Sequence, residues 1–118
     1  MDNKSFALLA AETLDNKKAA DITVIDVAEK SSFADYLVIA TGNSERQVNT
    51  LTDEVEEVFA KEGLFVKSIE GKQNSGWVLM DFGDIIVNIF TKDTREKYSI
   101  EKVWGDCTFL DWEAKEKK

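Results

Sequence analysis

Residues 76–90 read GWVLMDFGDIIVNIF, two apolar runs joined by the pair Gly83 and Asp84. Such a pair favours a type II′ β-hairpin, because glycine accepts the positive φ that the first turn position requires. If Phe82 faces Ile85 across the turn, the alternation of side chains gives the hairpin two different faces. One face is wholly apolar: Val78, Met80, Phe82, Ile85, Val87 and Ile89. The other is mixed: Trp77, Leu79, Asp81, Ile86, Asn88 and Phe90. We expect the apolar face to meet the core helices and the mixed face to be incompletely buried.

Helices and strands are predicted on both sides of this hairpin. Helical spacing of apolar residues predicts a helix over residues 5–16, and a capping box formed by Ser44 and Gln47 predicts another that stops at Gly63. The remaining predicted elements are strands over residues 22–27, 36–41, 64–69, 76–82 and 85–90, and one or two short helices over 93–103. The strand at 36–41 is almost uninterruptedly apolar, which suits a central strand covered on both faces. The order α-β-β-α-β-β-β-α predicts an α/β fold, a mixed sheet of about five strands flanked by helices.

Composition limits the classes of function. With 118 residues the chain is expected to form one domain over residues 1–112, followed by a charged, disordered tail over 113–118. Its net charge of −8 argues against general binding to DNA, which depends on Lys and Arg. The absence of histidine excludes a Ser-His-Asp triad. One cysteine and no long apolar run predict a cytoplasmic protein without a membrane span or disulfide.

The turn between the second strand and the long helix is one candidate site. Residues 41–44 read TGNS, and a Gly-Ser pair before a helix can present backbone donors to a phosphate. A magnesium-dependent nucleotidyltransferase would need at least two convergent carboxylates nearby. Asp26, Asp35 and Glu70 are the available donors, and no spacing in the sequence brings them together. Since Ser44 already has a capping role, we favour a cap and turn here and retain the enzyme as the alternative.

Three other polar residues are assigned structural roles. Asp26 shares a strand face with apolar residues, so it is expected to be hydrogen-bonded or at a rim of the sheet. Asp35 is expected to close the turn at residues 31–34. Cys107 has no histidine to activate it and is expected to be a free structural thiol.

Aromatic residues and arginine gather in the last third of the chain. Such residues are enriched in the hot spots of protein interfaces, because they bury much area at modest entropic cost. The set comprises Trp77, Asp81, Arg95, Tyr98 and Trp104. Each alone is more often a core residue, but together they make an interface as plausible as a core. The mixed face of the hairpin favours Trp77 in particular.

Three ordered blocks carry a resemblance to a known family. Residues 35–48 read DYLVIATGNSERQV, residues 76–87 read GWVLMDFGDIIV after Glu70-Gly71, and residues 95–104 read REKYSIEKVW. From about Ala10 to Asp106 the chain resembles the ribosomal silencing factor family, also called Iojap-like proteins. The resemblance implies a fold similar to nucleotidyltransferases without their catalytic acids.

The function that the resemblance implies is non-enzymatic and needs no cofactor or metal. Family members bind the large ribosomal subunit at ribosomal protein L14 (uL14) and block the joining of the small subunit, which lowers translation when nutrients are short. Isolated members often form homodimers, so the mixed face could serve self-association and ribosome binding in competition. The partner-binding residues implied here are Glu70, Trp77, Leu79, Asp81, Arg95, Tyr98 and Trp104. Asn88 stands where the family usually has His; it can hydrogen-bond but cannot titrate.

Overall fold

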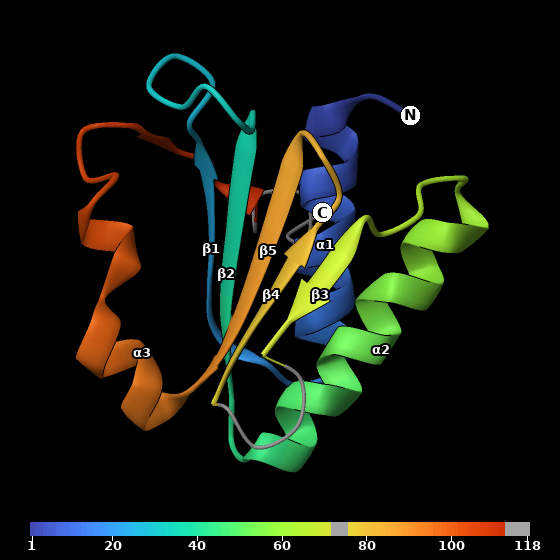
Figure 1. Cartoon of the computed structure of the whole chain (residues 1–118), viewed down its shortest axis with the longest axis vertical. Helices are drawn as coiled ribbons and strands as arrows, with labels where there is room; N and C mark the ends of the chain where they lie inside the picture. Colours follow the sequence, from blue (N-terminus) through green and yellow to red (C-terminus); the bar gives the residue numbers. More distant parts are fainter. Residues whose placement is uncertain (72–75, 113–118) are drawn as a thin grey trace.

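The structure is a computed structural model of the chain and describes residues 1–71 and 76–112. Three α-helices and a mixed sheet form the predicted α/β fold (Figure 1). The helices are α1 (Asn3–Asn16), α2 (Glu45–Lys61) and α3 (Lys92–Tyr98), with a short 3-10 helix, η1 (Ile100–Lys102), after α3. The strands are β1 (Ala20–Asp26), β2 (Tyr36–Gly42), β3 (Ser68–Glu70), β4 (Trp77–Asp81), β5 (Ile85–Thr91) and β6 (Thr108–Phe109). None of the helices in these described ranges is long and apolar enough to cross a membrane.

The sheet has the strand order β3-β4-β5-β2-β1-β6. Strands β2 and β5 are parallel, starting with the pair Tyr36 and Ile85, and the other neighbouring pairs are antiparallel. These two strands lie in the middle of the sheet, where residues 37–42 and 85–90 are all buried. The prediction of a central strand covered on both faces is therefore confirmed for β2.

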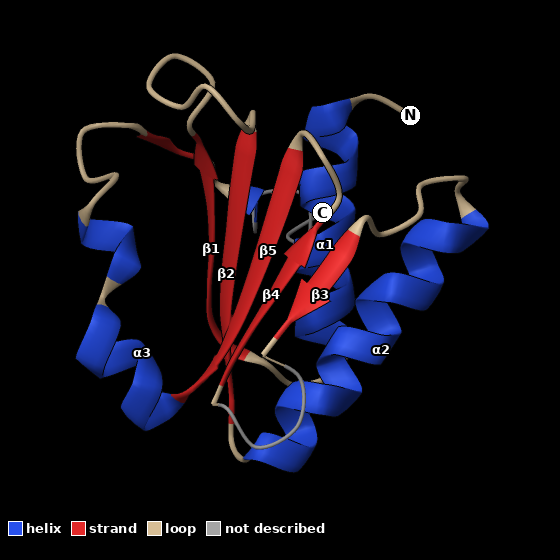
Figure 2. Ribbon diagram, in the orientation of Figure 1, coloured by secondary structure: helices blue, strands red, loops and turns tan. Residues whose placement is uncertain are grey.

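One face of the sheet packs against α1 and α2, and α3 lies on the other side (Figure 2). All six residues predicted for the apolar face of the hairpin lie in the core cluster beneath α1 and α2. The ring of Phe59 on α2 lies between those of Phe6 and Phe82, with centroid separations of 5.1 and 4.6 Å. At the turn, Gly83 has a φ of 97°, as the first position of a II′ turn requires.

Two strands differ from the sequence prediction. The third strand, predicted over 64–69, is confined to Ser68–Glu70 because the start of that segment still closes the helix before it. The backbone N–H of Leu64 donates to the carbonyl of Phe59 at 3.0 Å, and Gly63 has a φ of 90°. The sixth strand, β6, was not predicted, because two residues are too few to show an alternating pattern. The tail predicted over residues 113–118 lies outside the described residues.

Candidate partner-binding site

The mixed face of the hairpin lies on the side of the sheet that carries α3. That helix contacts β2 and β5 and has no buried residue of its own. The side chains of Ile86 and Phe90 are buried beneath this face, whereas those of Trp77 and Leu79 are half-buried. Incomplete burial of the mixed face is therefore confirmed, and it leaves large apolar groups partly accessible.

Three rings from β4, β5 and α3 form an aromatic cluster on this face: Trp77, Phe90 and Tyr98. The indole of Trp77 stacks on Phe90 with centroids 5.0 Å apart and an interplanar angle of 29°. It contacts Tyr98 at 5.1 Å, and Tyr98 is 49% exposed. The indole nitrogen donates to Asn88 Oδ1 at 2.9 Å. The cluster is thus packed and hydrogen-bonded on its inner side and open on its outer side, as suits a preorganised contact surface.

A shallow hollow of about 220 Å³ adjoins the aromatic cluster. It is lined by Glu70, Gly71, Trp77 and Leu79, from β3, the residue after it, and β4. Glu70 is exposed, so a carboxylate stands beside a largely apolar wall. The structure therefore brings four of the predicted site residues together on one surface: Glu70, Trp77, Leu79 and Tyr98.

Arg95 is placed differently, inside the molecule. Its guanidinium donates to the carbonyl of Asp21 at 2.6 Å and to the hydroxyls of Thr41 at 2.9 Å and Thr23 at 3.3 Å. Its Nε lies 3.5 Å from a carboxylate oxygen of Glu101, and the side chain is 11% exposed. Arg95 thus fixes α3, which carries Tyr98, to the ends of β1 and β2.

The two remaining predicted site residues also make internal contacts. Asp81 is half-buried at the end of β4, where its Oδ1 accepts from the backbone N–H of Gly83 at 2.8 Å. Trp104 is half-buried and packs beside the core under α3, with its ring 6.3 Å from that of Phe33. Asp81 therefore supports the hairpin turn. Trp104 supports the segment after α3.

Asn88 and Phe90 hold Trp77, and the site prediction did not include them. The register of the hairpin predicts that Phe90 lies beside Trp77. Once Phe82 is taken to face Ile85, counting outward pairs Trp77 with Phe90, and this pair is present in the sheet. The indole hydrogen bond to Asn88 is a diagonal contact, which strand alternation alone does not specify.

Two of the three carboxylates considered for a magnesium site, Asp26 and Asp35, have structural contacts. Asp26 Oδ1 accepts from the backbone N–H of Ala28 at 3.1 Å, in agreement with its predicted structural role. The prediction for Asp35 is wrong: its carboxylate accepts from the side chain of Asn3, and Ser31 Oγ closes the 31–34 turn by accepting from two backbone N–H groups. No group of three or more His, Cys, Asp or Glu residues that could hold a metal ion occurs in the part of the chain that the structure describes.

The predicted cap of α2 by Ser44 is confirmed, and the return bond of the capping box reaches Asn43, the residue before the N-cap. Ser44 Oγ accepts from the backbone N–H of Gln47 at 3.1 Å, and Gln47 Oε1 accepts from the backbone N–H of Asn43. The backbone N–H of Gln47, a donor that a phosphate at this helix end would need, is therefore already engaged by Ser44. The cap-and-turn interpretation accounts for each of these contacts.

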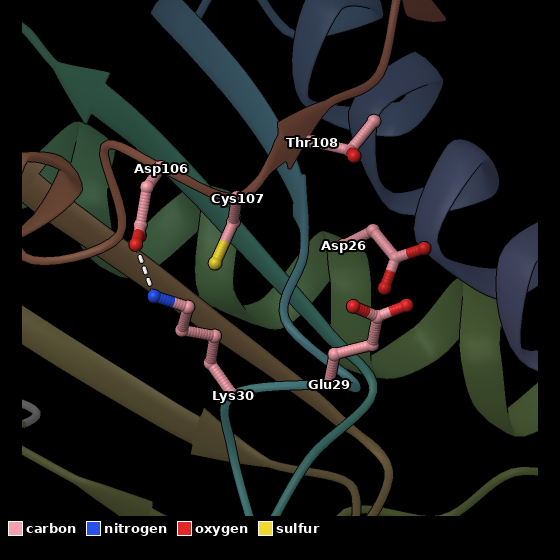
Figure 3. Close-up of a pocket in the computed structure, with 6 residues that line it drawn as sticks. All are labelled: Asp26, Glu29, Lys30, Asp106, Cys107 and Thr108. Carbon is pink, nitrogen blue, oxygen red and sulfur yellow. Dashed lines mark hydrogen bonds and ion pairs between the residues drawn. The ribbon is translucent and has the colours of Figure 1, made fainter.

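A second hollow, of about 110 Å³, lies near β1 and β6 (Figure 3). It is lined by Asp26, Glu29, Lys30, Asp106, Cys107 and Thr108. Figure 3 shows Lys30 reaching Asp106 on one side of the free thiol of Cys107. The hydrogen bond with Asp106 raises the pKa of Lys30 and lowers the pKa of Asp106. Both groups are exposed, so their attraction is screened by solvent.

Comparison with known proteins identifies the family. Residues 1–118 match the family described as "Ribosomal silencing factor during starvation". The chain is 40% identical to the ribosomal silencing factor of Bacillus subtilis over 94% of each chain. It is 33% identical to the mouse protein named "Mitochondrial assembly of ribosomal large subunit protein 1", covering 83% of this chain and 44% of the relative.

Solved structures agree in fold as well as in sequence. A crystal structure of a Chromobacterium violaceum protein is similar with a TM-score of 0.86 and 33% identity, covering 89% of this chain and 88% of the other. One from Bacillus halodurans is similar with a TM-score of 0.80 and 34% identity, covering 92% and 99%. On these matches, the chain belongs to the ribosomal silencing factor family, whose names connect it with regulation of translation.

Proposed function

We propose that this protein is a non-catalytic repressor of translation that binds the large ribosomal subunit through ribosomal protein L14 (uL14). In the bound state it occupies space that the small subunit needs, so the two subunits cannot join. The observation that carries the proposal is the half-exposed aromatic cluster, which lies beside the hollow of Glu70 and Leu79 in a chain of this family. Aromatic groups held rigidly at a surface are typical anchors of protein interfaces.

Mass action explains how occlusion represses translation. A protein that binds the free large subunit and excludes the small one lowers the concentration of large subunits competent to join. Such repression would conserve amino acids and energy when nutrients are limited. The protein would act in the cytoplasm, where the subunits join. The net charge of −8 would speed encounter with a basic protein surface.

The candidate residues divide into contacting and supporting groups. Glu70, Trp77, Leu79 and Tyr98 would contact the partner, because their side chains reach the open side of the mixed face. Asp81, Arg95 and Trp104 would support that surface through the internal contacts described above. In the free protein the same apolar surface would form a homodimer, so dimerisation and ribosome binding would compete.

Sucrose-gradient analysis with purified subunits tests the proposal. Excess protein should reduce the fraction of joined ribosomes, and the protein should migrate with the large subunit. Trp77→Ala should abolish both effects, whereas Phe65→Ala should not, since Phe65 is 69% exposed on the segment between α2 and β3. Unchanged subunit joining at excess wild-type protein would refute the function. Normal activity of Trp77→Ala would refute the site alone.

Two further measurements address the partner and the alternative activity. Sedimentation of the free protein, and then of its mixture with isolated uL14, should show a dimer replaced by a one-to-one complex. Calorimetry with ATP and magnesium should give no saturable heat. A saturable heat would favour the nucleotidyltransferase over the inert binding protein.

A further inference from the structure

Asn88 is a polar residue in the most buried strand of the sheet. Residues 85–90 of β5 are all buried, and Asn88, 1% exposed, is the one polar side chain among them. Its neighbours in the adjoining strands, Ile39 on β2 and Leu79 on β4, are apolar. A carboxamide in such surroundings costs free energy unless it is hydrogen-bonded. The stability of Asn88 at this position therefore depends on a hydrogen-bond partner.

The contact is with the indole of Trp77. Nε1 of Trp77 donates to Oδ1 of Asn88 at 2.9 Å, from the diagonal position across the β4–β5 pair. Stacking on Phe90 fixes the plane of the indole but not which edge points towards the sheet. A half-turn about the Cβ–Cγ bond would return the ring to roughly the same plane, because that torsion is about two-fold. The hydrogen bond selects one of these two orientations.

We infer that Asn88 is a positioning residue for partner binding: by accepting the indole N–H it holds Trp77 in the orientation that the partner meets. This inference rests on the proposed function, since it takes Trp77 to be a contacting residue. Asn88 itself is 1% exposed and does not reach the partner. It acts through Trp77, and neither the ring contact with Phe90 nor the one with Tyr98 by itself selects the edge of the indole.

A purely structural Asn88 would behave differently from a positioning Asn88. Replacing a buried carboxamide by an apolar side chain of similar shape removes its cost of desolvation, and the half-buried indole N–H can turn towards water. Asn88→Leu keeps the branching at Cγ and removes the acceptor. We therefore expect this variant to keep the stability of the wild type while it loses affinity for large subunits. A structural role would give the opposite result, a loss of stability without a specific loss of affinity.

The experiment compares four variants of the full chain: Asn88→Leu, Trp77→Phe, the double variant and Thr52→Val. Thr52→Val is the matched control, because Thr52 is equally buried but lies on α2, where its Oγ1 donates to the carbonyl of Val48. Asn88→Leu should bind large subunits roughly threefold to tenfold more weakly, the range of one net hydrogen bond. Its urea midpoint should not fall below that of Thr52→Val, and Thr52→Val should bind like the wild type.

The double variant tests whether Asn88 acts through the indole N–H. In the Trp77→Phe background, which has no N–H to accept, Asn88→Leu should cause no further loss of affinity. An equal loss in both backgrounds would overturn the inference. If Asn88→Leu fails to fold, Asn88→Val takes its place in the same cycle.

Nuclear magnetic resonance separates this inference from the proposed function. The indole N–H signal of Trp77, identified by its loss in Trp77→Phe, should exchange slowly with water in the wild type and faster in Asn88→Leu. An unchanged signal would overturn the inference even if subunit binding is normal. If wild-type protein does not bind subunits at all, the proposed function fails, while the signal still reports whether Asn88 orients Trp77.

Discussion

Arg95 and Thr41 are 54 positions apart in the sequence, yet Nη1 of Arg95 donates to the hydroxyl of Thr41 at 2.9 Å. The same guanidinium reaches the carbonyl of Asp21 and the hydroxyl of Thr23. Since α3 buries none of its own residues, this network and the contact between Trp77 and Tyr98 hold the helix against the sheet. The position of Tyr98 in the proposed interface therefore depends on an internal residue.

Removing the guanidinium should loosen α3. We expect Arg95→Ala to lower the free energy of unfolding by about 1.5–3 kcal/mol, the range for hydrogen bonds that involve a charged group. Amide exchange of α3 should accelerate more than that of β2 or β5. Arg95→Lys should restore little, because one ammonium cannot match the fork of the guanidinium. Urea unfolding measures the loss of stability, and hydrogen exchange measures the opening of α3. Equal acceleration of amide exchange in α3 and across the whole sheet would contradict a local role of Arg95.

The ring of Tyr98, rather than its hydroxyl, should carry its part of the interface. Tyr98 touches Trp77 through its ring and is half-exposed. Tyr98→Ala should weaken binding to large subunits by at least tenfold, in the range of an interface hot spot. Tyr98→Phe should bind within about twofold of the wild type, because it keeps the ring that contacts Trp77. Equilibrium binding to purified subunits distinguishes the ring from the hydroxyl, and a large loss in Tyr98→Phe would assign the contact to the hydroxyl.

The capping residue of α2 should affect stability but not binding. Ser44→Ala removes the acceptor for the N–H of Gln47 and should cost about 1 kcal/mol of stability. Ser44→Asp should retain most of it, because a carboxylate also caps and suits the positive end of the helix dipole. Thermal unfolding by circular dichroism measures both effects. Subunit binding should be unchanged in both variants, and a loss of binding would point back to a ligand at residues 41–44.

The ion pair of Lys30 and Asp106 should make a small contribution to stability that depends on pH. The pKa of Asp106 is lowered on folding from its ordinary 3.8, so its contribution is present above that value and is lost as the pH falls through the folded pKa. The pKa of Lys30 is raised from 10.5, so its contribution is present below that value and is lost as the pH rises through the folded pKa.

The difference in unfolding free energy between wild type and Asp106→Asn should therefore be largest near neutral pH. It should shrink at acid and at strongly alkaline pH, and added salt should reduce it, because both groups are exposed. Urea unfolding across this range is the measurement. Glu57→Gln, a neutralisation on the exposed side of α2, controls for the change in net charge. A difference that does not vary with pH would exclude the ion pair as its cause.

The sequence predicted those parts of the fold that local patterns determine. The turn at Gly83 and the period of two placed all six apolar hairpin residues correctly, and the uniformly apolar run from Tyr36 identified the central strand. Residue patterns do not predict a strand as short as β6. They also place the start of β3 too early, because the backbone N–H of Leu64 is hydrogen-bonded to the end of α2.

The candidate site was less predictable, because its contacts join segments that are distant in the sequence. Residue type suggested that Arg95 lies at an interface, but its hydrogen-bond partners come from β1 and β2 and are defined only by the tertiary fold. Asp35 was assigned to its nearest turn, and its carboxylate instead contacts Asn3, 32 positions earlier. Trp77 and Leu79, by contrast, followed from strand alternation, since this rule also fixes which face a residue occupies.

The parallel pairing of β2 with β5 has a consequence for biosynthesis. Tyr36 lies beside Ile85, a residue that leaves the translating machinery only after α2, β3 and β4 have been made. Until then β2 lacks one of its two neighbours, and its apolar run stays unprotected on that edge. Distant pairings of this kind close slowly. We therefore expect the nascent chain to acquire its native structure late, once about three-quarters of it has emerged, and to need shielding from aggregation before that point.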